Sequence, residues 1–387
     1  MAPTNETAEV AIIGGGVIGL AIARALALRG VRDVLLIERG SLGAESSSAA
    51  AGMLAPQAEA NRPHEFFQLS CRSRDMYPAL AAALLEETGI DIELETTGTL
   101  YLAFTEFGVE DIEIRYEWQK KAGLPIEKLD LKAAKSLEPT ISDDAGAAVW
   151  FPQDIQVENR RLISALAAAN EKLGVRLETG TAVKDLRIEQ GRIAGIETSR
   201  GFVATDRVVI AAGAWSSLLG AGDIPVPHLR IRPVRGQMLC FRGKPRIARP
   251  VIHSMYGYIV PRRDGRLLTG STKDDVGFEK RVTLMGVSSM LTTALEMSPR
   301  ITSLELVGYW SGLRPRANDT LPVLGPCAEI AGVFYATGHY RNGILLAPIT
   351  GDLIARAIVD NEFPPELNIF SPDRFGMQTI RHSGIFI

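Results

Sequence analysis

The chain opens with a glycine-rich turn that directly follows an apolar segment. Residues 9–13 (EVAII) are mostly apolar and β-branched, which is typical of a short buried strand. Gly14, Gly16 and Gly19 follow in the spacing G-x-G-x-x-G. In this pattern the glycines let the chain turn tightly and bring its backbone close to a pyrophosphate, which rests on the N-terminus of the next helix. The turn therefore predicts a nucleotide-binding site.

The residues after the turn complete this unit. An Ala- and Leu-rich helix is expected over 20–28 and ends at Gly30, and a second buried strand is expected over 34–37. Glu38 stands at the carboxyl end of that strand, where an acid accepts both hydroxyls of a ribose. The same acid disfavours a 2′-phosphate, so NADP is not expected. NAD and FAD both fit.

Composition excludes several classes of protein. Hydrophobic residues make up 46% of the 387 and charged residues 22%, which predicts a folded chain rather than a disordered one. The 42 basic and 45 acidic residues nearly balance, so no nucleic-acid partner is expected. The three cysteines, Cys71, Cys240 and Cys327, are far apart and predict neither a disulfide framework nor a metal site. No secretory signal or membrane span is apparent, so we expect a cytoplasmic protein without a membrane partner.

Strand-to-glycine transitions recur over 207–216 and 332–344, the latter continuing into a helix from about 343 to 359. Hairpins are expected over 184–198 and 256–271. The predicted class is α/β, with a Rossmann-like nucleotide-binding domain and a second α+β substrate domain built mainly on an antiparallel sheet. The expected boundaries are 1–85, 151–220 and 325–373 for the discontinuous nucleotide domain, 86–150 and 221–324 for the substrate domain, and 374–387 for a C-terminal tail.

Five stretches resemble the FAD-dependent amino-acid oxidase superfamily, and within it most closely the bacterial glycine oxidases of the thiamine pathway. They are GGGVIGLAIA at residues 14–23, SSSAAAGM at 46–53, YIVPR at 258–262, GLRP at 312–315 and GHYRNGILLAP at 338–348. The resemblance extends from about residue 8 to about residue 373, and the last stretch is the most specific to the subfamily.

The resemblance implies FAD rather than NAD, in agreement with the single dinucleotide pattern of the chain. It implies oxidation of a small amino acid with O2 as electron acceptor, and we expect a homo-oligomer. Some relatives attach the flavin through a cysteine of the substrate side, but the segment around 310–315 has none. Non-covalent FAD is therefore expected.

Four residues are expected at the substrate. By resemblance, Arg314 of the Gly-Leu-Arg-Pro motif anchors the substrate carboxylate, for which guanidinium offers two parallel donors. Tyr258 is similar to the tyrosine that donates to the same carboxylate. Tyr256, two residues earlier, is expected on the same strand face. Arg341 is a further candidate cation, and no side chain is expected to act as a catalytic base.

The expected FAD contacts combine the glycine turn, the small residues after the second strand, and the start of the last helix. That helix N-terminus is partially positive and suits the anionic reduced flavin; His339 beside it is expected to be a structural residue. The expected set is Gly14, Gly16, Val17, Ile18, Gly19, Glu38, Arg39, Ser46, Ser47, Ala50, Ala51, Gly52, Met53, Val183, Ala212, Gly213, Trp215, Gly338, His339, Arg341, Asn342, Gly343 and Ile344.

Two other functions remain open from the sequence. The first is a related flavoenzyme: a sarcosine or D-amino-acid oxidase, or a D-amino-acid dehydrogenase linked to a quinone. The second is a non-catalytic FAD-binding protein. The sequence does not rank glycine against sarcosine or D-alanine, since the depth of a pocket is a tertiary property.

Overall fold

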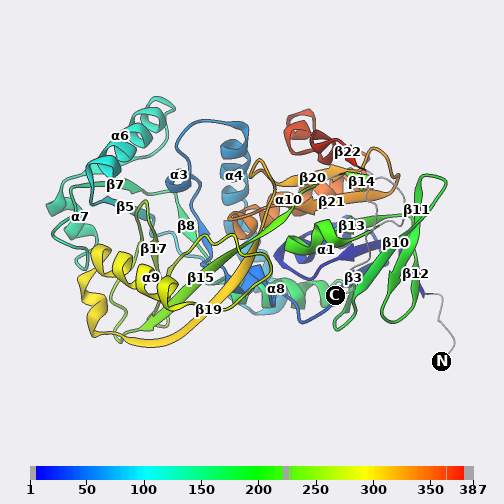
Figure 1. The fold of residues 1–387 in the computed structure, drawn as a ribbon, viewed down its shortest axis with the longest axis horizontal. Helices are drawn as coiled ribbons and strands as arrows, with labels where there is room; N and C mark the ends of the chain where they lie inside the picture. Colours follow the sequence, from blue (N-terminus) through cyan, green and yellow to red (C-terminus); the bar gives the residue numbers. More distant parts are fainter. Residues whose placement is uncertain (1–5, 221–225, 228, 363, 379–387) are drawn as a thin grey trace.

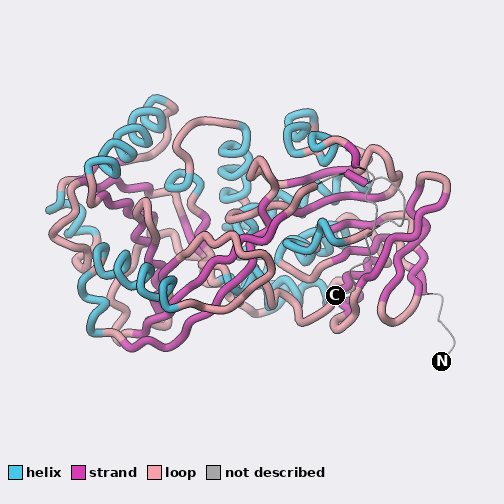
Figure 2. Tube along the Cα trace, viewed as in Figure 1, coloured by secondary structure: helices cyan, strands magenta, loops and turns pink. Residues whose placement is uncertain are grey.

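Two large sheets, one in each half of the long axis, organise the molecule (Figures 1 and 2). The computed structural model describes residues 6–220, 226–227, 229–362 and 364–378. One sheet has six strands and the other eight. Smaller sheets and helices cover their faces, and none of the helices in these residues is long and apolar enough to cross a membrane.

The six-stranded sheet is the Rossmann-like part. Its order is β20–β21–β13–β2–β3–β9, and its strands run parallel except β20, which is antiparallel to β21. It confirms the expected α/β class and the expected strand over 34–37. Its strands are β2 (Val10–Ile13), β3 (Val34–Ile37), β9 (Arg176–Glu178), β13 (Val208–Ile210), β20 (Val323–Pro326) and β21 (Val333–Thr337).

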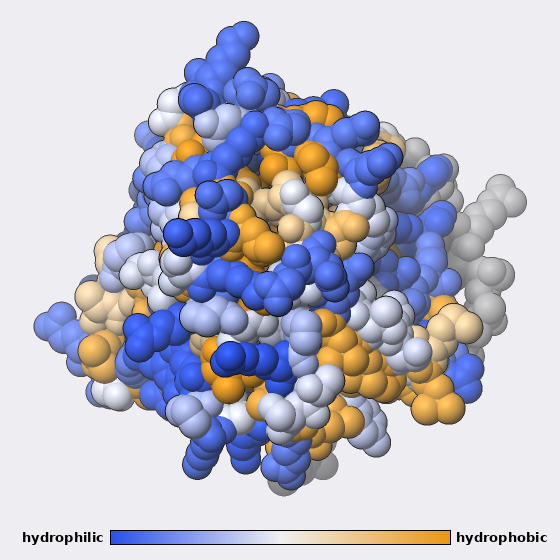
Figure 3. Space-filling view, turned by 90° about the vertical axis from the view of Figure 1, so that its left-hand side faces the viewer, coloured by the Kyte–Doolittle hydropathy of each residue, from blue (hydrophilic) through white to orange (hydrophobic). Residues whose placement is uncertain are grey.

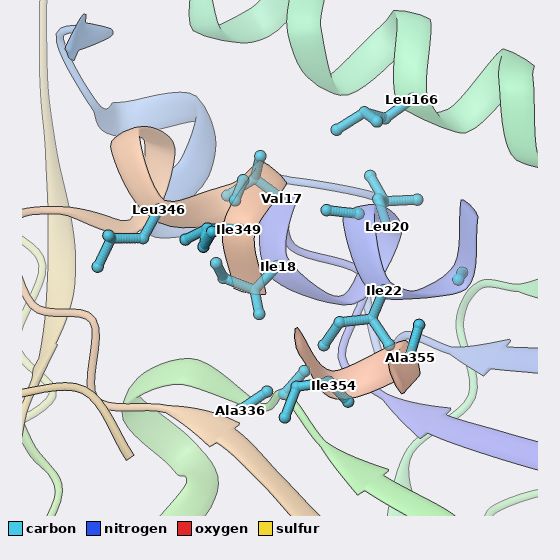
Figure 4. Close-up of a cluster of buried hydrophobic side chains, with 14 of the residues drawn as sticks. Val17, Ile18, Leu20, Ile22, Leu166, Ala336, Leu346, Ile349, Ile354 and Ala355 are labelled. Atoms are coloured by element: carbon cyan, nitrogen blue, oxygen red, sulfur yellow. The ribbon is translucent and has the colours of Figure 1, made fainter. Parts of the chain in front are cut away.

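Both faces of this sheet are buried, which explains its continuous apolar strands. Val10 and Ile12 pack against helices α1 (Val17–Leu28), α8 (Asn159–Lys172) and α10 (Gly343–Val359), where side chains of α1 and α10 interdigitate (Figure 4). Ala11 and Ile13 face the four-stranded sheet β1–β12–β11–β10. The bounds of this sheet are β1 (Glu6–Thr7), β10 (Val183–Glu189), β11 (Arg192–Thr198) and β12 (Phe202–Ala204).

Helix α1 begins three residues earlier than the sequence analysis predicted. It includes Gly19, where a Cβ atom would overlap the carbonyl oxygen of Gly14. The third glycine of the pattern therefore lies within the first turns of the helix and lets it pack against the loop. The last helix, α10, has its predicted bounds.

The eight-stranded sheet has the order β19–β15–β18–β17–β16–β5–β7–β6 and confirms a mainly antiparallel second sheet, because only β5 and β16 pair in parallel. Helix α9 (Leu284–Met297) packs on one face of it. Its strands are β5 (Thr99–Ala103), β6 (Glu127–Leu129), β7 (Ala147–Phe151), β15 (Arg232–Arg242), β16 (Val251–His253), β17 (Tyr258–Pro261), β18 (Arg266–Gly270) and β19 (Glu305–Arg316).

Both predicted hairpins form. Strands β10 and β11 meet at Gln190 and Gly191, which have φ of 51° and 74°. Strands β17 and β18 form the other hairpin. Tyr256, however, precedes β17: it lies in a bend closed by the hydrogen bond from Ser254 N to Gly257 O. Its expected place on the strand face is therefore wrong.

The remaining elements connect and cover the two large sheets. The predicted domain boundaries stay a prediction, and most of the predicted tail, residues 379–387, lies outside the described residues. The other elements are α2 (Ser46–Ala49), β4 (Met53–Leu54), α3 (Pro56–Glu59), α4 (Glu65–Asp75), α5 (Tyr77–Thr88), α6 (Glu106–Lys121), α7 (Leu131–Leu137), β8 (Ile155–Gln156), β14 (Val226–Pro227) and β22 (Met377–Gln378), with 3₁₀ turns at Gly213–Leu218, Pro299–Ser303, Pro365–Phe370 and Pro372–Phe375.

The end of the molecule near α6, α7 and α9 shows a mixed surface. Hydrophilic side chains predominate there, with separate hydrophobic patches between them (Figure 3). Phe107 of α6 and Leu284 and Met285 of α9 are among the exposed hydrophobic residues of the chain.

Candidate active site

A cavity of about 430 Å³ is lined by both large sheets. Its walls come from the glycine turn after β2, the end of β3, the segment around α2 and β4, and strands β15, β17 and β19. Most residues that the sequence analysis selected are among its lining. They are Gly14, Gly16, Val17, Ile18, Glu38, Arg39, Ser46, Ser47, Ala50, Ala51, Gly52, Met53, Val183, Ala212, Gly213, Trp215, Tyr258, Arg314, His339, Arg341, Gly343 and Ile344.

Four selected residues are not part of the lining. Gly19 is buried under the glycine turn, and Gly338 and Asn342 lie beside the cavity wall, in the segment between β21 and α10. Tyr256 is 62% exposed. The structure thus brings the sequence motifs together but leaves this tyrosine at the surface.

The glycine turn leaves room for a ligand at the N-terminus of α1. Gly14 has φ of 114°, and a Cβ atom there would lie 2.5 Å from the carbonyl oxygen of Ala211. Gly16, the N-cap residue, has no side chain to cover the helix end, and the Oγ of Ser47 accepts from Val17 N at 3.0 Å. The partial positive charge of this helix end favours an anion such as a pyrophosphate.

Glu38 is fixed by the backbone around it. Its Oε2 accepts from Gly15 N and its Oε1 from Gly40 N, both at 2.8 Å. Each carboxylate oxygen has a second lone pair, so the side chain is oriented in the cavity wall and can still accept from a ribose. Arg39, the next residue, stacks over the Trp215 ring at 3.8 Å from its centroid.

Arg262 holds the segment under the cavity, a role that the sequence analysis missed. Its Nη2 donates to Ala51 O and its Nη1 to Val157 O, each at 2.7 Å. Burial lowers the pKa of this guanidinium to about 10. Gly52 follows Ala51, and a Cβ atom on it would overlap the same carbonyl oxygen of Val157. The arginine thus joins the hairpin of the second sheet to the small-residue segment 50–53.

Arg314 is a cation without an acidic partner. Its Nη2 donates to Ser271 Oγ at 2.6 Å and its Nη1 to Thr272 O at 3.0 Å, and it forms no ion pair with any acid of the described residues. Burial lowers its pKa from the usual value for arginine. The side chain extends over Gly236 of β15, where any Cβ atom would overlap the guanidinium. The glycine is thus required for this placement.

Tyr258 lies beside Arg314 in the cavity wall. It is 7% exposed, and its hydroxyl lies 3.4 Å from Met238 Sδ. A thioether is a weak acceptor, so the hydroxyl proton remains available to a stronger acceptor in the cavity.

Arg341, in contrast, has a carboxylate partner. Its Nη2 donates to Glu59 Oε1 at 2.6 Å, and Glu59 itself lines the cavity. Burial by itself would raise the pKa of Glu59, but Arg341 and then His253 outweigh it and hold that pKa well below its usual range. The pair is therefore charged, and its two charges compensate each other.

His339 is buried and uncharged. Its Nε2 lies 3.1 Å from the Oγ1 of Thr350 in α10. Burial lowers its pKa to about 3, so near neutral pH it carries no positive charge. These contacts agree with a structural role.

Several lining residues carried no signal in the sequence. Glu59, Gly236, Met238 and Ser271 belong to no motif. Strand pairing brings Gly236 and Met238 of β15, and Ser271 after β18, to the cavity, whereas Glu59 is placed by the contacts of α3. Gly312, which did lie in a motif, pairs directly with Gly236 across β19 and β15.

Comparison with known proteins agrees with this geometry. The family of FAD-dependent oxidoreductases known as DAO matches residues 9–357. Glycine oxidase of Geobacillus kaustophilus is 40% identical over 369 residues, covering 95% of this chain and 97% of that protein. Its crystal structure superposes with a TM-score of 0.90 at 38% identity and covers 98% of this chain and 100% of that one.

A second kind of relative is longer. The bifunctional protein ThiO/ThiG of Trichormus variabilis is 38% identical over 376 residues, which cover 96% of this chain but 56% of that protein. The chain thus spans about half the length of the bifunctional relatives that it matches.

The cavity, the glycine turn and the two sheets define a flavoenzyme, and the chain belongs to the FAD-dependent oxidoreductase family. It is an FAD-dependent enzyme whose relatives include bacterial glycine oxidases. The expected cofactor and superfamily are therefore confirmed.

Proposed function

We propose that this enzyme oxidises glycine and other small amino acids or amines, such as sarcosine and D-alanine. The observation that carries the proposal is the unpaired positive charge of Arg314 in the cavity wall. A buried charge is costly unless it meets an opposite charge. A substrate carboxylate supplies that charge, and the guanidinium fork matches it with two parallel donors.

The surrounding residues orient this anchor. Ser271 and the carbonyl of Thr272 accept from its Nη atoms and hold the guanidinium plane. We assign to the Tyr258 hydroxyl a hydrogen bond to the same carboxylate, since its contact with Met238 is weak. Arg341 is a weaker candidate for the anchor, because Glu59 already neutralises it.

When bound, FAD would supply the redox chemistry, as acceptor of the hydride from the substrate α-carbon with O2 as the final oxidant and H2O2 as its product. The residues proposed to hold it are those of the glycine turn, Glu38, the segment 46–53, and the N-terminus of α10. The protein excludes water and aligns the substrate. The imine product then hydrolyses in water to glyoxylate, or another 2-oxo acid, and the amine, which is ammonia for a primary amino acid and methylamine for sarcosine.

No protein base is required in this scheme. When the amine is neutral, its lone pair forms the C=N bond as the hydride leaves the α-carbon, so no proton passes to the protein. The neutral His339 is already in contact with Thr350. The side chains bind and orient the substrate rather than exchange protons with its α-carbon.

The direct test is peroxide release by the purified holoenzyme in air with glycine, sarcosine, D-alanine and D-proline. Turnover of at least one small amino acid with stoichiometric H2O2 is expected. Reduction of an added quinone without peroxide indicates a dehydrogenase instead. A protein that binds FAD but oxidises none of these substrates contradicts the proposal.

A further inference from the structure

Glu59 holds a distinct position in the cavity. Three acids line this cavity, but Glu38 and Glu45 contact the glycine turn and Arg39. Glu59 instead belongs to the part of the wall that contains Arg341. The amino-acid end of the cavity therefore has an anion as well as the unpaired cation Arg314.

The backbone around Glu59 is held from both sides. It is the last residue of α3, and Asp154 accepts from two backbone N–H groups of that helix at 3.2 and 3.0 Å. Arg115 donates to the carbonyls on either side, Ala58 O at 2.8 Å and Ala60 O at 2.9 Å. The carboxylate is therefore presented from a fixed main chain, as a ligand-positioning residue requires.

Only one of the two carboxylate oxygens is occupied. Oε1 accepts from Arg341 and lies 3.7 Å from His253 Nε2. Oε2 has no hydrogen bond to any of the described residues. Neither ring nitrogen of the buried His253 has a partner within them either. Oε2 of Glu59 is therefore an acceptor in the cavity wall that a hydrogen-bond donor on a ligand can use.

We propose that Glu59 accepts a hydrogen bond from the amino group of the substrate and thereby selects amino acids over other carboxylates of the same size. The inference rests on the proposed function and deepens it. Arg314 takes the carboxylate and Glu59 accepts from the nitrogen, so a ligand with both groups makes a favourable contact at each of its two ends. A carboxylate without an amino group uses only the first contact.

Two unreactive ligands separate these contacts. Both 2-aminoisobutyrate and isobutyrate have the carboxylate, but only the first has an amino group, and 2-aminoisobutyrate has no α-hydrogen to lose. Their Kd values are measured from the visible spectrum of the FAD-loaded enzyme, for wild type, Glu59→Gln and Glu59→Ala. The control is Glu65→Gln, which changes an exposed glutamate of α4.

Loss of the Glu59 carboxylate should raise the Kd of 2-aminoisobutyrate by at least about tenfold, because it removes one hydrogen bond to a charged group. The Kd of isobutyrate should not rise, because Arg341 then loses its partner and the cavity becomes more positive. KM for glycine should rise more than kcat falls. Glu65→Gln should match wild type.

Equal weakening of both ligands, or no change in either, overturns the proposal. The first result would assign Glu59 to the structure of the cavity, and the second would place the amino group elsewhere. Failure of the proposed function is a separate outcome: wild type then oxidises no amino acid, whereas the ratio of the two Kd values is still measurable.

Discussion

At the scale of single residues, the contrast between the two cavity arginines carries the functional argument. Arg341 has an acid at 2.6 Å, whereas Arg314 has only neutral acceptors around it. Similar side chains in one cavity thus offer different chemistry. The compensated guanidinium shapes the wall, and the uncompensated one is suited to a ligand carboxylate.

Glu38→Ala should weaken FAD binding by about one to two powers of ten. The change removes the proposed acceptor of the ribose hydroxyls, together with the two backbone contacts of Glu38 to Gly15 and Gly40. A hydrogen bond to a charged group contributes roughly 1.5–3 kcal/mol, and 1.4 kcal/mol is about tenfold in affinity. Titration of the apoprotein with FAD measures the effect. An unchanged Kd would show that Glu38 is only a charge at the end of a strand.

Site residues that belong to a local sequence motif could be predicted from the sequence. Gly14, Gly16 and Glu38 follow from the geometry of one βαβ unit, so their places were predictable. Glu59 comes to the cavity through contacts with Asp154 and Arg115, which are far away in the chain. No local sequence pattern predicts such a long-range contact.

At the scale of elements, the pairing of β15 with β19 creates the place for Arg314. Gly236→Ala should lower kcat/KM by at least about tenfold with FAD content unchanged, because the new Cβ atom would displace the guanidinium. Gly308→Ala on β19 is the control, since its nearest neighbour would lie at 3.9 Å, an ordinary contact. Steady-state kinetics with an amino acid measure both. Equal activity of the two variants would contradict the placement of Arg314.

Helix α3 is held by a carboxyl group whose ionisation affects stability. Burial raises the pKa of Asp154 to about 7 from an ordinary 3.8, although two backbone N–H groups and Arg74 oppose the shift. Between these values the folded protein binds a proton that the unfolded chain has released. The stabilisation is therefore complete below pH 3.8 and is lost as the pH rises through 7.

Between pH 5 and 7 the free energy of unfolding of the wild type should fall relative to that of Asp154→Asn, by on the order of 1 kcal/mol per pH unit. Urea unfolding at several pH values measures this difference. Parallel pH dependences for the two proteins would show that Asp154 does not retain its proton in the folded state.

Elements with a clear hydrophobic period could be predicted from the sequence, whereas the residues at which they begin and end were harder to predict. The hairpin β10–β11 follows from alternation about Gln190 and Gly191, and α10 follows from a continuous apolar stretch. Tyr256 was misplaced because the bend at Ser254–Gly257, closed by a backbone hydrogen bond, interrupts the apparent alternation before β17. A turn of this kind depends on the tertiary path of the chain.

At the scale of the whole molecule, the cofactor cavity joins the two large sheets, so bound FAD should stabilise the entire fold. The Tm of the protein should rise with FAD concentration, as expected for a ligand that binds only the folded state. Differential scanning calorimetry of apoprotein with increasing FAD measures this. A Tm independent of FAD would place the cofactor outside the cooperative unit.

The flavin should also be released from the chain by acid. None of the three cysteines, Cys71, Cys240 and Cys327, lines the cavity. Acid precipitation should therefore leave FAD in the supernatant and a colourless pellet. Yellow colour that remains with the precipitated chain would contradict non-covalent binding.

The central claim is that Arg314 holds the substrate carboxylate, and the most direct measurement compares Arg314→Ala with Arg316→Ala. Both change an arginine of β19, but Arg316 pairs with Asp275 and does not line the cavity. Loss of one partner of a buried charge pair costs roughly 2–5 kcal/mol, so Arg314→Ala should lower kcat/KM for an amino acid by at least ~30-fold at normal FAD content. Arg314→Lys should fall between this variant and wild type, and Arg316→Ala should resemble wild type. Full amino-acid activity in Arg314→Ala would contradict the account.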